Sequence, residues 1–124
     1  MIPENNFTPA PIKETVTHED LDKLDVRVGT IERVENVAKS DKLIKLIVNF
    51  GDHTRCILVG MKKERLNPRE ELEGRQSLFV VNLAPRKMAG EISQGMMFDI
   101  GHSDGLLPVL AVPERRIANG SRAG

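Results

Sequence analysis

The sequence predicts an all-β protein with short helices, folded as a small barrel of five strands. Three observations support this class: short apolar runs rich in β-branched residues recur along the chain, glycine or proline separates many of them, and both helix signatures are only a few residues long. At 124 residues the chain suffices for one small core but not for two domains. We expect one folded unit over residues 17–124, preceded by a proline-containing arm over residues 1–16 that is extended or disordered.

A short helix is expected directly after the arm. Thr17 and Asp20 have the spacing of a capping box, and Leu21 and Leu24 fall on one face. Because so short a helix is unstable alone in water, it must pack on another part of the protein. For the arm itself, the alternative to disorder is packing against a partner subunit.

Three strands with short connections follow. Residues 26–37 are rich in β-branched side chains, and their alternation loses phase around Gly29, as expected of a bulge or bend that lets one long strand serve both sides of a small barrel. Residues 43–50 alternate apolar and polar side chains, Gly51 marks a turn, and residues 54–59 form the next strand. This order indicates an antiparallel meander.

A second helix and two further strands complete the predicted barrel. Asn67 caps the helix, Pro68 occupies its first turn and Gly74 ends it. The next strand covers residues 77–83, and the last one begins near Met96. Three strands, a short helix and two strands is the element order of an OB-fold, a five-stranded Greek-key barrel.

Apolar side chains in these runs predict the core. We expect Phe50, Phe79 and Phe98 to be buried, with Met96 and Ile100 on the same face as Phe98. Cys56 is the single cysteine, which excludes an internal disulfide and a cysteine metal cluster, and its apolar neighbours indicate a small buried hydrophobe. No apolar stretch approaches the roughly 18–20 residues that cross a bilayer, and no secretory signal is recognisable. We therefore expect a cytoplasmic protein that does not contact a membrane.

Catalytic and cofactor-binding patterns are not recognisable in the sequence. His18, His53 and His102 lie in different segments without the spacing of metal ligands. Phosphate-binding loops, nucleophile elbows and paired cysteines are missing too, and Ser93 has no identifiable base beside it. We expect a protein that is not an enzyme and that uses no cofactor and no metal.

Charge is balanced overall but unevenly distributed along the chain. The 18 basic and 18 acidic residues cancel, yet residues 31–90 contain 12 basic and 8 acidic side chains. Residues 1–30, with 3 basic and 6 acidic side chains, and residues 91–124, with 3 and 4, are net acidic. The basic middle is compatible with moderate, salt-sensitive binding of phosphates. A solvated surface of mixed charge is the alternative.

The stretch NLAPRKMAGEISQGMM, residues 82–97, carries the most informative pattern. Pro85 ends a sheet ladder because it lacks an amide hydrogen, and Arg86 and Lys87 follow at once. Gly90 lets the chain turn back towards a further strand. Two basic side chains are thus expected on a stiffened loop between two strands, an arrangement that suits an anion.

This stretch resembles the signature of tRNA-binding domains, which occur at the end of many bacterial methionyl-tRNA synthetases, in free-standing tRNA-binding proteins, in CsaA-type export chaperones and in the endothelial-monocyte-activating cytokine precursor. SDKLIKLIVNFG, residues 40–51, is a second match, and LDVRVGTI, residues 24–31, is a weaker third. The three matches come in the family's order, and the resemblance covers roughly residues 21–119. It implies the same OB-fold.

The resemblance also implies which residues contact RNA. The tRNA-binding residues that it implies are Lys42, Lys45, Asn82, Arg86, Lys87 and Ser93. Arg55 is added from the residue pattern, because Lys45 and Arg55 alternate with core residues on adjacent strands and are expected to extend the same patch. The basic ones would supply charge to phosphates, whereas the asparagine and the serine would donate neutral hydrogen bonds. Each basic position has a plain alternative as solvated barrel surface. The matched residues expected to shape the motif are Asp41, Pro85, Gly90, Gly95 and Met96, and the aspartate is expected to accept amide hydrogen bonds in its loop.

Residues 101–124 extend beyond a complete barrel. Residues 102–105 are typical of a turn, and residues 106–112 are apolar apart from Pro108, which suits an edge strand. In the family that the chain resembles, free-standing members are homodimers through this extension and the segment before the first strand, which implies a homodimer here. The alternative is an extension that folds back as a flap on its own barrel.

Three functions remain open at this point. The first is a non-catalytic protein that recognises the shape and backbone of folded tRNA, either free-standing or as an accessory subunit of a synthetase, because few aromatic side chains are present to stack bases of a long single strand. The second is a CsaA-type chaperone that binds unfolded polypeptides or export components in an apolar groove formed by residues 106–112. The third is an assembly module that tethers a synthetase and has no RNA affinity of its own.

Overall fold

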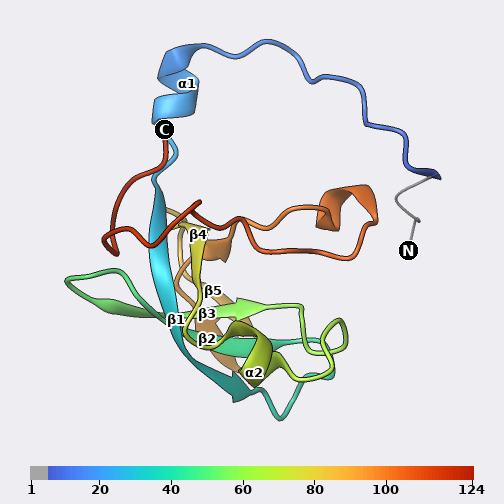
Figure 1. Cartoon of the computed structure of the whole chain (residues 1–124), viewed down its shortest axis with the longest axis vertical. Helices are drawn as coiled ribbons and strands as arrows, with labels where there is room; N and C mark the ends of the chain where they lie inside the picture. The colour runs from blue at the N-terminus through green and yellow to red at the C-terminus, as the bar shows by residue number, and fades with distance from the viewer. Residues whose placement is uncertain (1–5) are drawn as a thin grey trace.

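The computed structural model describes residues 6–124, so the first five residues of the expected arm lie outside the described part of the chain. Its elements are α1 (His18–Asp22), β1 (Val26–Asn36), β2 (Ile44–Asn49), β3 (Thr54–Val59), α2 (Pro68–Leu72), β4 (Gln76–Val80), β5 (Arg86–Met88), β6 (Glu91–Ser93), β7 (Met96–Met97) and the 3-10 helix η2 (His102–Asp104). The strands form the body of the molecule, and the arm with α1 reaches away from it (Figure 1).

Five strands form one antiparallel sheet in the order β3-β2-β1-β4-β7, which curls into a nearly closed barrel. The long strand β1 pairs with β4 through its first half and with β2 through its second half. The barrel closes next to β3, where the backbone amide of Gln94 donates to the carbonyl of Cys56 over 2.8 Å. The expected all-β OB-fold with its meander of the first three strands is confirmed.

The bend in β1 lies later in the strand than predicted. The register between β1 and β2 shifts between Ile31 and Arg33, beyond Gly29. Gly29 is needed for packing instead, because a β-carbon there would lie 2.5 Å from Val48 Cγ1 and 2.9 Å from Phe50 Cε1. Its missing side chain lets the core approach the strand closely.

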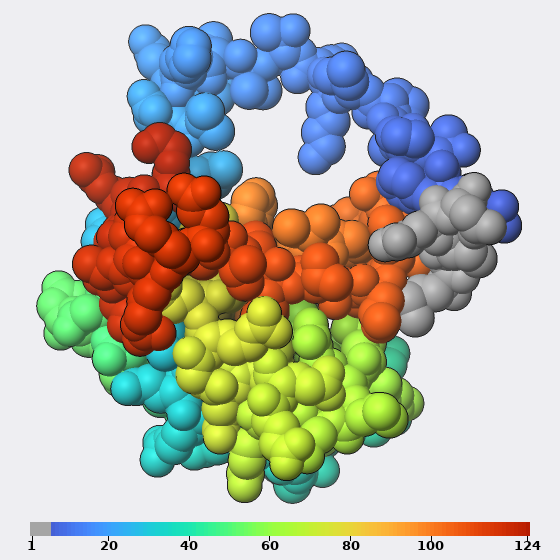
Figure 2. Space-filling model, in the orientation of Figure 1, coloured from blue at the N-terminus to red at the C-terminus, as the bar shows by residue number. Residues whose placement is uncertain are grey.

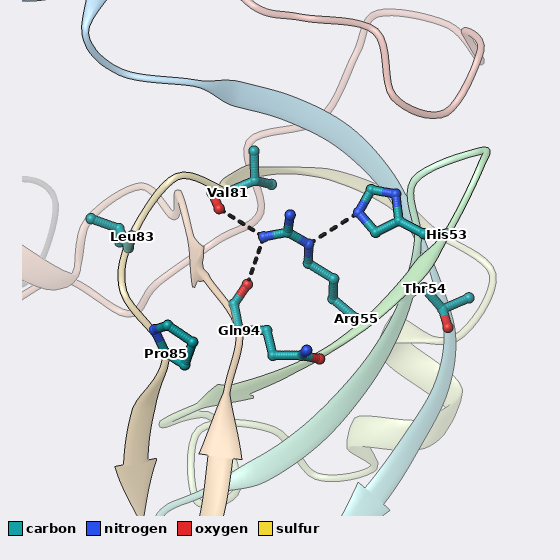
Figure 3. A pocket seen from close by; sticks show the side chains of 7 residues that line it. All are labelled: His53, Thr54, Arg55, Val81, Leu83, Pro85 and Gln94. Atoms are coloured by element: carbon teal, nitrogen blue, oxygen red, sulfur yellow. Dashed lines mark hydrogen bonds between the residues drawn. The ribbon is translucent and has the colours of Figure 1, made fainter.

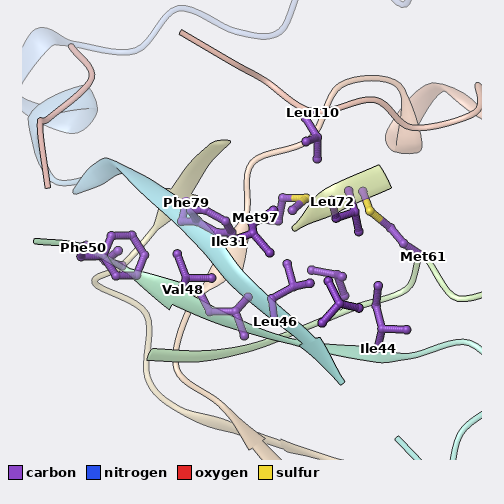
Figure 4. Packing of buried hydrophobic residues seen from close by; sticks show 14 residues of the cluster. Ile31, Ile44, Leu46, Val48, Phe50, Met61, Leu72, Phe79, Met97 and Leu110 are labelled. Carbon is purple, nitrogen blue, oxygen red and sulfur yellow. The ribbon is translucent and has the colours of Figure 1, made fainter. Parts of the chain in front are cut away.

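The core is apolar and takes alternate residues from the strands, as the burial along β2 shows. Phe50 and Phe79 are fully buried and meet edge to face, with ring centroids 5.6 Å apart. Leu110 of the C-terminal extension closes the cluster from one side (Figure 4). Every fully buried side-chain polar atom in residues 6–124 has a hydrogen-bond partner.

The core prediction for Phe98 is wrong. Met97 is buried, with 5% of its surface exposed, whereas Met96, Phe98 and Ile100 are exposed to 48%, 47% and 56%. The alternation is present, but pairing of Phe79 with Met97 turns the other set of side chains outwards. A row of three apolar side chains is therefore left on the surface.

The C-terminal extension lies partly on its own barrel. The amide of Val28 donates to the Ser121 carbonyl over 2.9 Å, and the Gly120 amide donates back to Val28 over 2.8 Å, so the chain end runs along the first half of β1. Asn119 Oδ1 accepts hydrogen bonds from Thr30 Oγ1 and from Gln76 Nε2, at 2.8 and 2.9 Å. Gly120 has a φ of 88° and leaves no space for a β-carbon against the Phe50 carbonyl.

Both helices form where predicted, but α1 does not pack on the described part of its own chain. Thr17 Oγ1 accepts from the Asp20 amide over 3.1 Å, which confirms the capping box, and Asn67 caps α2 in the same manner. No residue of α1 is buried, and Leu21 and Leu24 are exposed to 56% and 52%. Figure 2 shows α1 and the arm as an arch over an open space, with the far end of the arm curving back to the side of the orange C-terminal extension. No helix within residues 6–124 has the length and apolar character to span a membrane.

Candidate nucleic-acid interface

Arg86 and Lys87 lie on a short hairpin rather than on an irregular loop. β5 pairs with β6 so that Arg86 faces Ser93 and Lys87 faces Ile92 across the ladder. The turn between them has positive φ angles at Ala89 and Gly90, 50° and 80°, which is the geometry of a type I′ turn. Because successive strand residues point to opposite faces, the two cations project on opposite sides of the hairpin.

Neither cation is neutralised by the rest of the described protein. Arg86 and Lys87 are both exposed, and neither has an ion pair or a side-chain hydrogen bond with any of residues 6–124. The hairpin that carries them is anchored to the barrel, because the Leu58 amide of β3 donates to Ser93 Oγ over 3.0 Å. Two available positive charges are therefore held on a fixed support.

The tip of the hairpin meets the β1–β2 loop. A β-carbon on Gly90 would lie 3.6 Å from Lys39 Cδ and Nζ. This loop also carries the exposed Lys42, and it is held in shape by Lys62, whose ammonium group donates to the carbonyls of Val37 (2.9 Å) and Ser40. Lys39 and Lys62 were not predicted from the sequence, because only the fold brings these segments together. In OB-folds the equivalent loops and the face of strands 2 and 3 bind oligonucleotides.

The role predicted for Asp41 in this loop is taken by its neighbour. Ser40 Oγ accepts from the amides of Lys42 and Leu43, at 3.2 and 3.0 Å. Asp41 instead pairs with Lys63 on the surface, with Oδ2 and Nζ 3.1 Å apart. The hydrogen bond from Lys63 holds the pKa of the Asp41 carboxyl below its usual value.

Lys45 lies on the outer face of β2 and is already paired. Its ammonium group is 2.7 Å from Glu91 Oε1 and 3.5 Å from Glu35 Oε1. The hydrogen bond to Glu91 raises the pKa of Lys45. Cys56 lies in the same electrostatic environment on β3, where burial raises the pKa of its thiol, with smaller contributions from the neighbouring charges.

Arg55 points the other way from Lys45, so the two do not form the single patch expected from the sequence. Arg55 pairs with Val48 of β2, whose side chain is buried, and its guanidinium group lies 6.0 Å from the centre of the Phe50 ring. Its Nη1 donates to the carbonyls of Val81 and Gln94, at 2.7 and 3.0 Å. Arg55 thereby ties β3 to the segments that follow β4 and β6.

The two neutral residues of the predicted site have their polar groups engaged inside the protein. Asn82 Oδ1 accepts from the Asp25 amide over 2.8 Å, and its Nδ2 donates to the Lys23 carbonyl over 2.7 Å, which fixes the joint between α1 and β1. Ser93 is 4% exposed, and its hydroxyl donates to the Gly95 carbonyl over 2.9 Å. These two side chains position the chain around the hairpin.

The glycine between β6 and β7 allows a close contact of backbones. Gly95 has a φ of 151°, and a β-carbon there would lie 2.9 Å from the Val80 carbonyl. Met96, the next residue, is exposed. No group of three or more His, Cys, Asp or Glu side chains within residues 6–124 is arranged to hold a metal ion.

A cavity lies where the hairpin leaves the barrel. It has a volume of about 440 Å³ and is lined by His53, Thr54, Arg55, Val81, Leu83, Pro85 and Gln94. Figure 3 shows the Arg55 guanidinium group between Val81, Gln94 and His53, with the paired strands β5 and β6 running away from Pro85 and Gln94. The cavity thus adjoins the residue before Arg86.

Residues 26–122, which include the barrel, the hairpin and the cavity, match the family described as a putative tRNA binding domain. The chain belongs to this family. As a tRNA-binding domain it is 40% identical over 118 residues to a methionine–tRNA ligase of Bacteroides fragilis and 42% identical over 113 residues to that of Porphyromonas gingivalis, which covers 95% and 91% of the chain. It spans only 17% and 16% of the length of these two ligases.

Solved structures show the same fold along most of the chain. A methionyl-tRNA synthetase related protein from Pyrococcus horikoshii has a TM-score of 0.81 and 36% identity, covering 90% of this chain and 100% of that one. The chaperone CsaA from Bacillus anthracis has a TM-score of 0.74 and 29% identity, with the same coverage. The resemblance to both branches of the family, noted in the sequence, is confirmed.

Proposed function

We propose that this tRNA-binding domain is a non-catalytic, cytoplasmic protein that binds folded tRNA through its phosphate backbone, free-standing or as an accessory subunit of a synthetase. The observation that carries the proposal is that Arg86 and Lys87 are exposed, and unpaired within residues 6–124, on a hairpin fixed to the barrel. Lys39 and Lys42 on the adjoining loop extend the positive surface. Membership of a family described as tRNA-binding supports the identity of the anion.

Recognition of shape and backbone fits these residues better than base stacking along a single strand. A cation without a protein partner binds a phosphate without breaking an existing ion pair, which Lys45 would have to do. Of the aromatic side chains available for stacking, Phe50 and Phe79 are buried in the core. A folded RNA presents phosphates and hydroxyl groups in fixed positions, which suits charged side chains on a rigid support.

The test is a binding titration with tRNA at about 50 and about 200 mM salt, with an unstructured RNA of equal length as competitor, because binding driven by phosphates weakens with salt. We expect the protein to prefer tRNA and to lose affinity at the higher salt. The double variant Arg86→Glu, Lys87→Glu should bind at least about tenfold more weakly, and the dependence of log affinity on log salt should flatten by about one unit for each phosphate that the variant no longer neutralises.

The matched control is the double variant Arg75→Glu, Arg115→Glu, which changes the net charge equally at two exposed positions outside the hairpin and its neighbouring loop. We expect its affinity for tRNA to stay within about twofold of the unmodified protein. Equal losses in both double variants would show that overall charge, not the hairpin, drives binding. Lack of tRNA binding even at low salt would contradict the proposed function.

We further propose that the domain acts as a homodimer. Several apolar side chains are exposed to solvent. Ile12 in the arm and Leu21 and Leu24 at α1 are more than half exposed, and Met96, Phe98 and Ile100 are about half exposed. A second copy would cover these side chains, because a five-residue helix is stable only when it packs. Light scattering should give twice the mass of one chain, and Leu24→Asp with Phe98→Asp should give the single-chain mass of 13.8 kDa.

A chaperone-like binder of unfolded polypeptides is the second candidate. The same exposed apolar side chains favour it, as does the likeness to the structure of the chaperone CsaA. The double variant Arg86→Glu, Lys87→Glu separates the two functions, because it should abolish tRNA binding and spare polypeptide binding. Loss of both activities, or of neither, would contradict that separation.

A further inference from the structure

We propose that the cavity beside Arg86, lined by Arg55, Leu83, Pro85 and Gln94 among others, is a subsite for one unstacked guanine base of the bound RNA. The inference rests on the proposed tRNA binding and adds recognition of a base to a surface that otherwise offers charges to phosphates.

The position of the cavity suits a nucleotide held by the hairpin. Leu83 and Pro85 form part of its lining, and Arg86 is the next residue of the chain. On the other strand, Gln94 follows Ser93, which pairs with Arg86. We therefore expect a nucleotide whose phosphate binds Arg86 to have its base within reach of the cavity.

Two rigidly held groups in the cavity have hydrogens to donate. Besides its two backbone acceptors, Arg55 donates from Nε to His53 Nε2 over 3.0 Å, so the guanidinium group is fixed while its Nη2 has no acceptor within residues 6–124. Gln94 Oε1 accepts from the Cys56 amide over 2.9 Å, which leaves the NH2 end of this side chain without a protein acceptor in the described part of the chain.

A donor of this kind suits an acceptor on the edge of guanine. Guanine presents O6 and N7 side by side as acceptors, and arginine is the side chain that pairs with them most often. Adenine presents an N6 amino donor beside N7, which would face the donors of Arg55 and Gln94 without an acceptor. The cavity is therefore expected to favour guanine over adenine.

The walls of the cavity suit a base better than a phosphate alone. Val81, Leu83 and Pro85 are apolar and offer no side-chain donor, so a phosphate held there by Arg55 or Gln94 would lose the water on its remaining oxygens without replacement. A base is flat and apolar on its faces and polar at its edge. The His53 ring, which stacks on Phe50 with centroids 5.6 Å apart, offers a fixed aromatic surface of the kind on which unstacked RNA bases are placed. The cavity volume of about 440 Å³ falls in the range of small-ligand sites, roughly 300–1,000 Å³.

The decisive experiment is methylation of a tRNA transcript by dimethyl sulfate, which modifies guanine N7, with and without saturating protein. We expect one guanine to become protected in the complex. The variant Gln94→Glu keeps an oxygen for the Cys56 amide but replaces the donor end with a second oxygen. At a protein concentration that still saturates the tRNA through Arg86 and Lys87, this variant should leave that guanine reactive. The control variant Ser103→Asp, which adds the same charge at the exposed η2, should still protect that guanine from methylation.

A second measurement follows the NMR signals of the Gln94 side-chain amide during titration with single nucleotides. GMP should shift these signals at concentrations at least about fivefold lower than AMP, because one well-placed pair of hydrogen bonds to a base discriminates against the wrong base at least that strongly. Ribose 5-phosphate, which lacks a base, should shift signals of the hairpin and leave those of Gln94 in place.

The outcomes separate the subsite from the proposed function. A tRNA that binds without protection of any guanine would overturn the subsite and leave tRNA binding intact. If no tRNA binds, the proposed function fails, and the titration with GMP and AMP decides the subsite by itself. Equal effects of GMP and AMP, or Gln94 shifts produced by an unfolded peptide but not by GMP, would also overturn the assignment to guanine.

Discussion

Two pairs of basic side chains, all expected in one binding patch, have opposite roles in the structure. The paired cations, Lys45 and Arg55 on β2 and β3, are held by ion pairs and hydrogen bonds within the barrel. The unpaired cations, Arg86 and Lys87 on β5, have no such partner within residues 6–124. The fold, rather than proximity to a sequence motif, therefore decides which of these cations the protein already holds and which remain available to a ligand.

The difference follows from where each strand lies. β2 and β3 belong to the barrel wall, where a long basic side chain either reaches a carboxylate across the sheet or caps the end of the core. β5 is the outer strand of a two-stranded hairpin, and in the described part of the chain it pairs only with β6. Its side chains have solvent on most sides, and this leaves their charges to a ligand.

The largest effect is expected from removing a paired cation, with Arg55→Met. This variant leaves the carbonyls of Val81 and Gln94 without their donor, and we expect the free energy of unfolding in urea to fall by about 2 kcal/mol. The same change at an unpaired cation, Arg86→Met, should alter the free energy of unfolding by less than about 0.5 kcal/mol. A stability loss of equal size in both variants would break the distinction between paired and unpaired cations.

A smaller effect is expected at the Lys45–Glu91 ion pair, measured through the neighbouring thiol. Burial is the main cause that raises the pKa of Cys56. The positive charge of Lys45 lowers this pKa, and the negative charge of Glu91 raises it. Glu91→Gln should therefore lower the pKa and speed alkylation of Cys56 at pH about 8 by about two- to threefold, and Lys45→Met should raise the pKa and slow the reaction by a similar factor. Rate changes in the same direction for both variants would contradict this arrangement of charges.

The helix caps and the strands were predictable because their signals are local. Thr17 with Asp20, and Asn67 with Pro68, specify helix starts within one turn, and alternation along β2 specifies its buried face. Other features depend on pairing between distant segments. Phe98 points to solvent because β7 pairs with β4 in the register that buries Met97. The bend in β1 lies where its register with β2 shifts.

The candidate site likewise combines features that the local sequence predicts with features that only the fold creates. Exposure of Arg86 was expected, because it follows a proline at the end of a strand. The sequence did not indicate that Glu91 binds Lys45, or that Gln94 and Arg55 meet in one cavity, since both contacts arise only when β6 closes the barrel against β3. Local patterns therefore predicted the exposure of Arg86, whereas the fold decided which of the basic side chains are neutralised.

The smallest effect is expected from converting a paired cation into an unpaired one, which tests directly whether a released charge binds RNA. Lys63 is 3.1 Å from Asp41 on the loop beside the hairpin, and Asp41→Asn releases it for a phosphate. We expect the affinity for tRNA to rise by about two- to threefold at about 50 mM salt and the gain to vanish near 200 mM, because exposed charges are screened. Urea unfolding should be unchanged, because both side chains are exposed.

Asp20→Asn is the matched control, because it releases Lys23 from an equivalent surface pair, also 3.1 Å long, at α1. It changes the net charge by the same amount but lies outside the hairpin and its neighbouring loop, so the affinity for tRNA should stay constant. If both variants raise the affinity equally, the gain comes from overall charge. If only Asp41→Asn does so, position beside the hairpin decides which released cation reaches the RNA, and the binding surface extends from Arg86 and Lys87 across the β1–β2 loop.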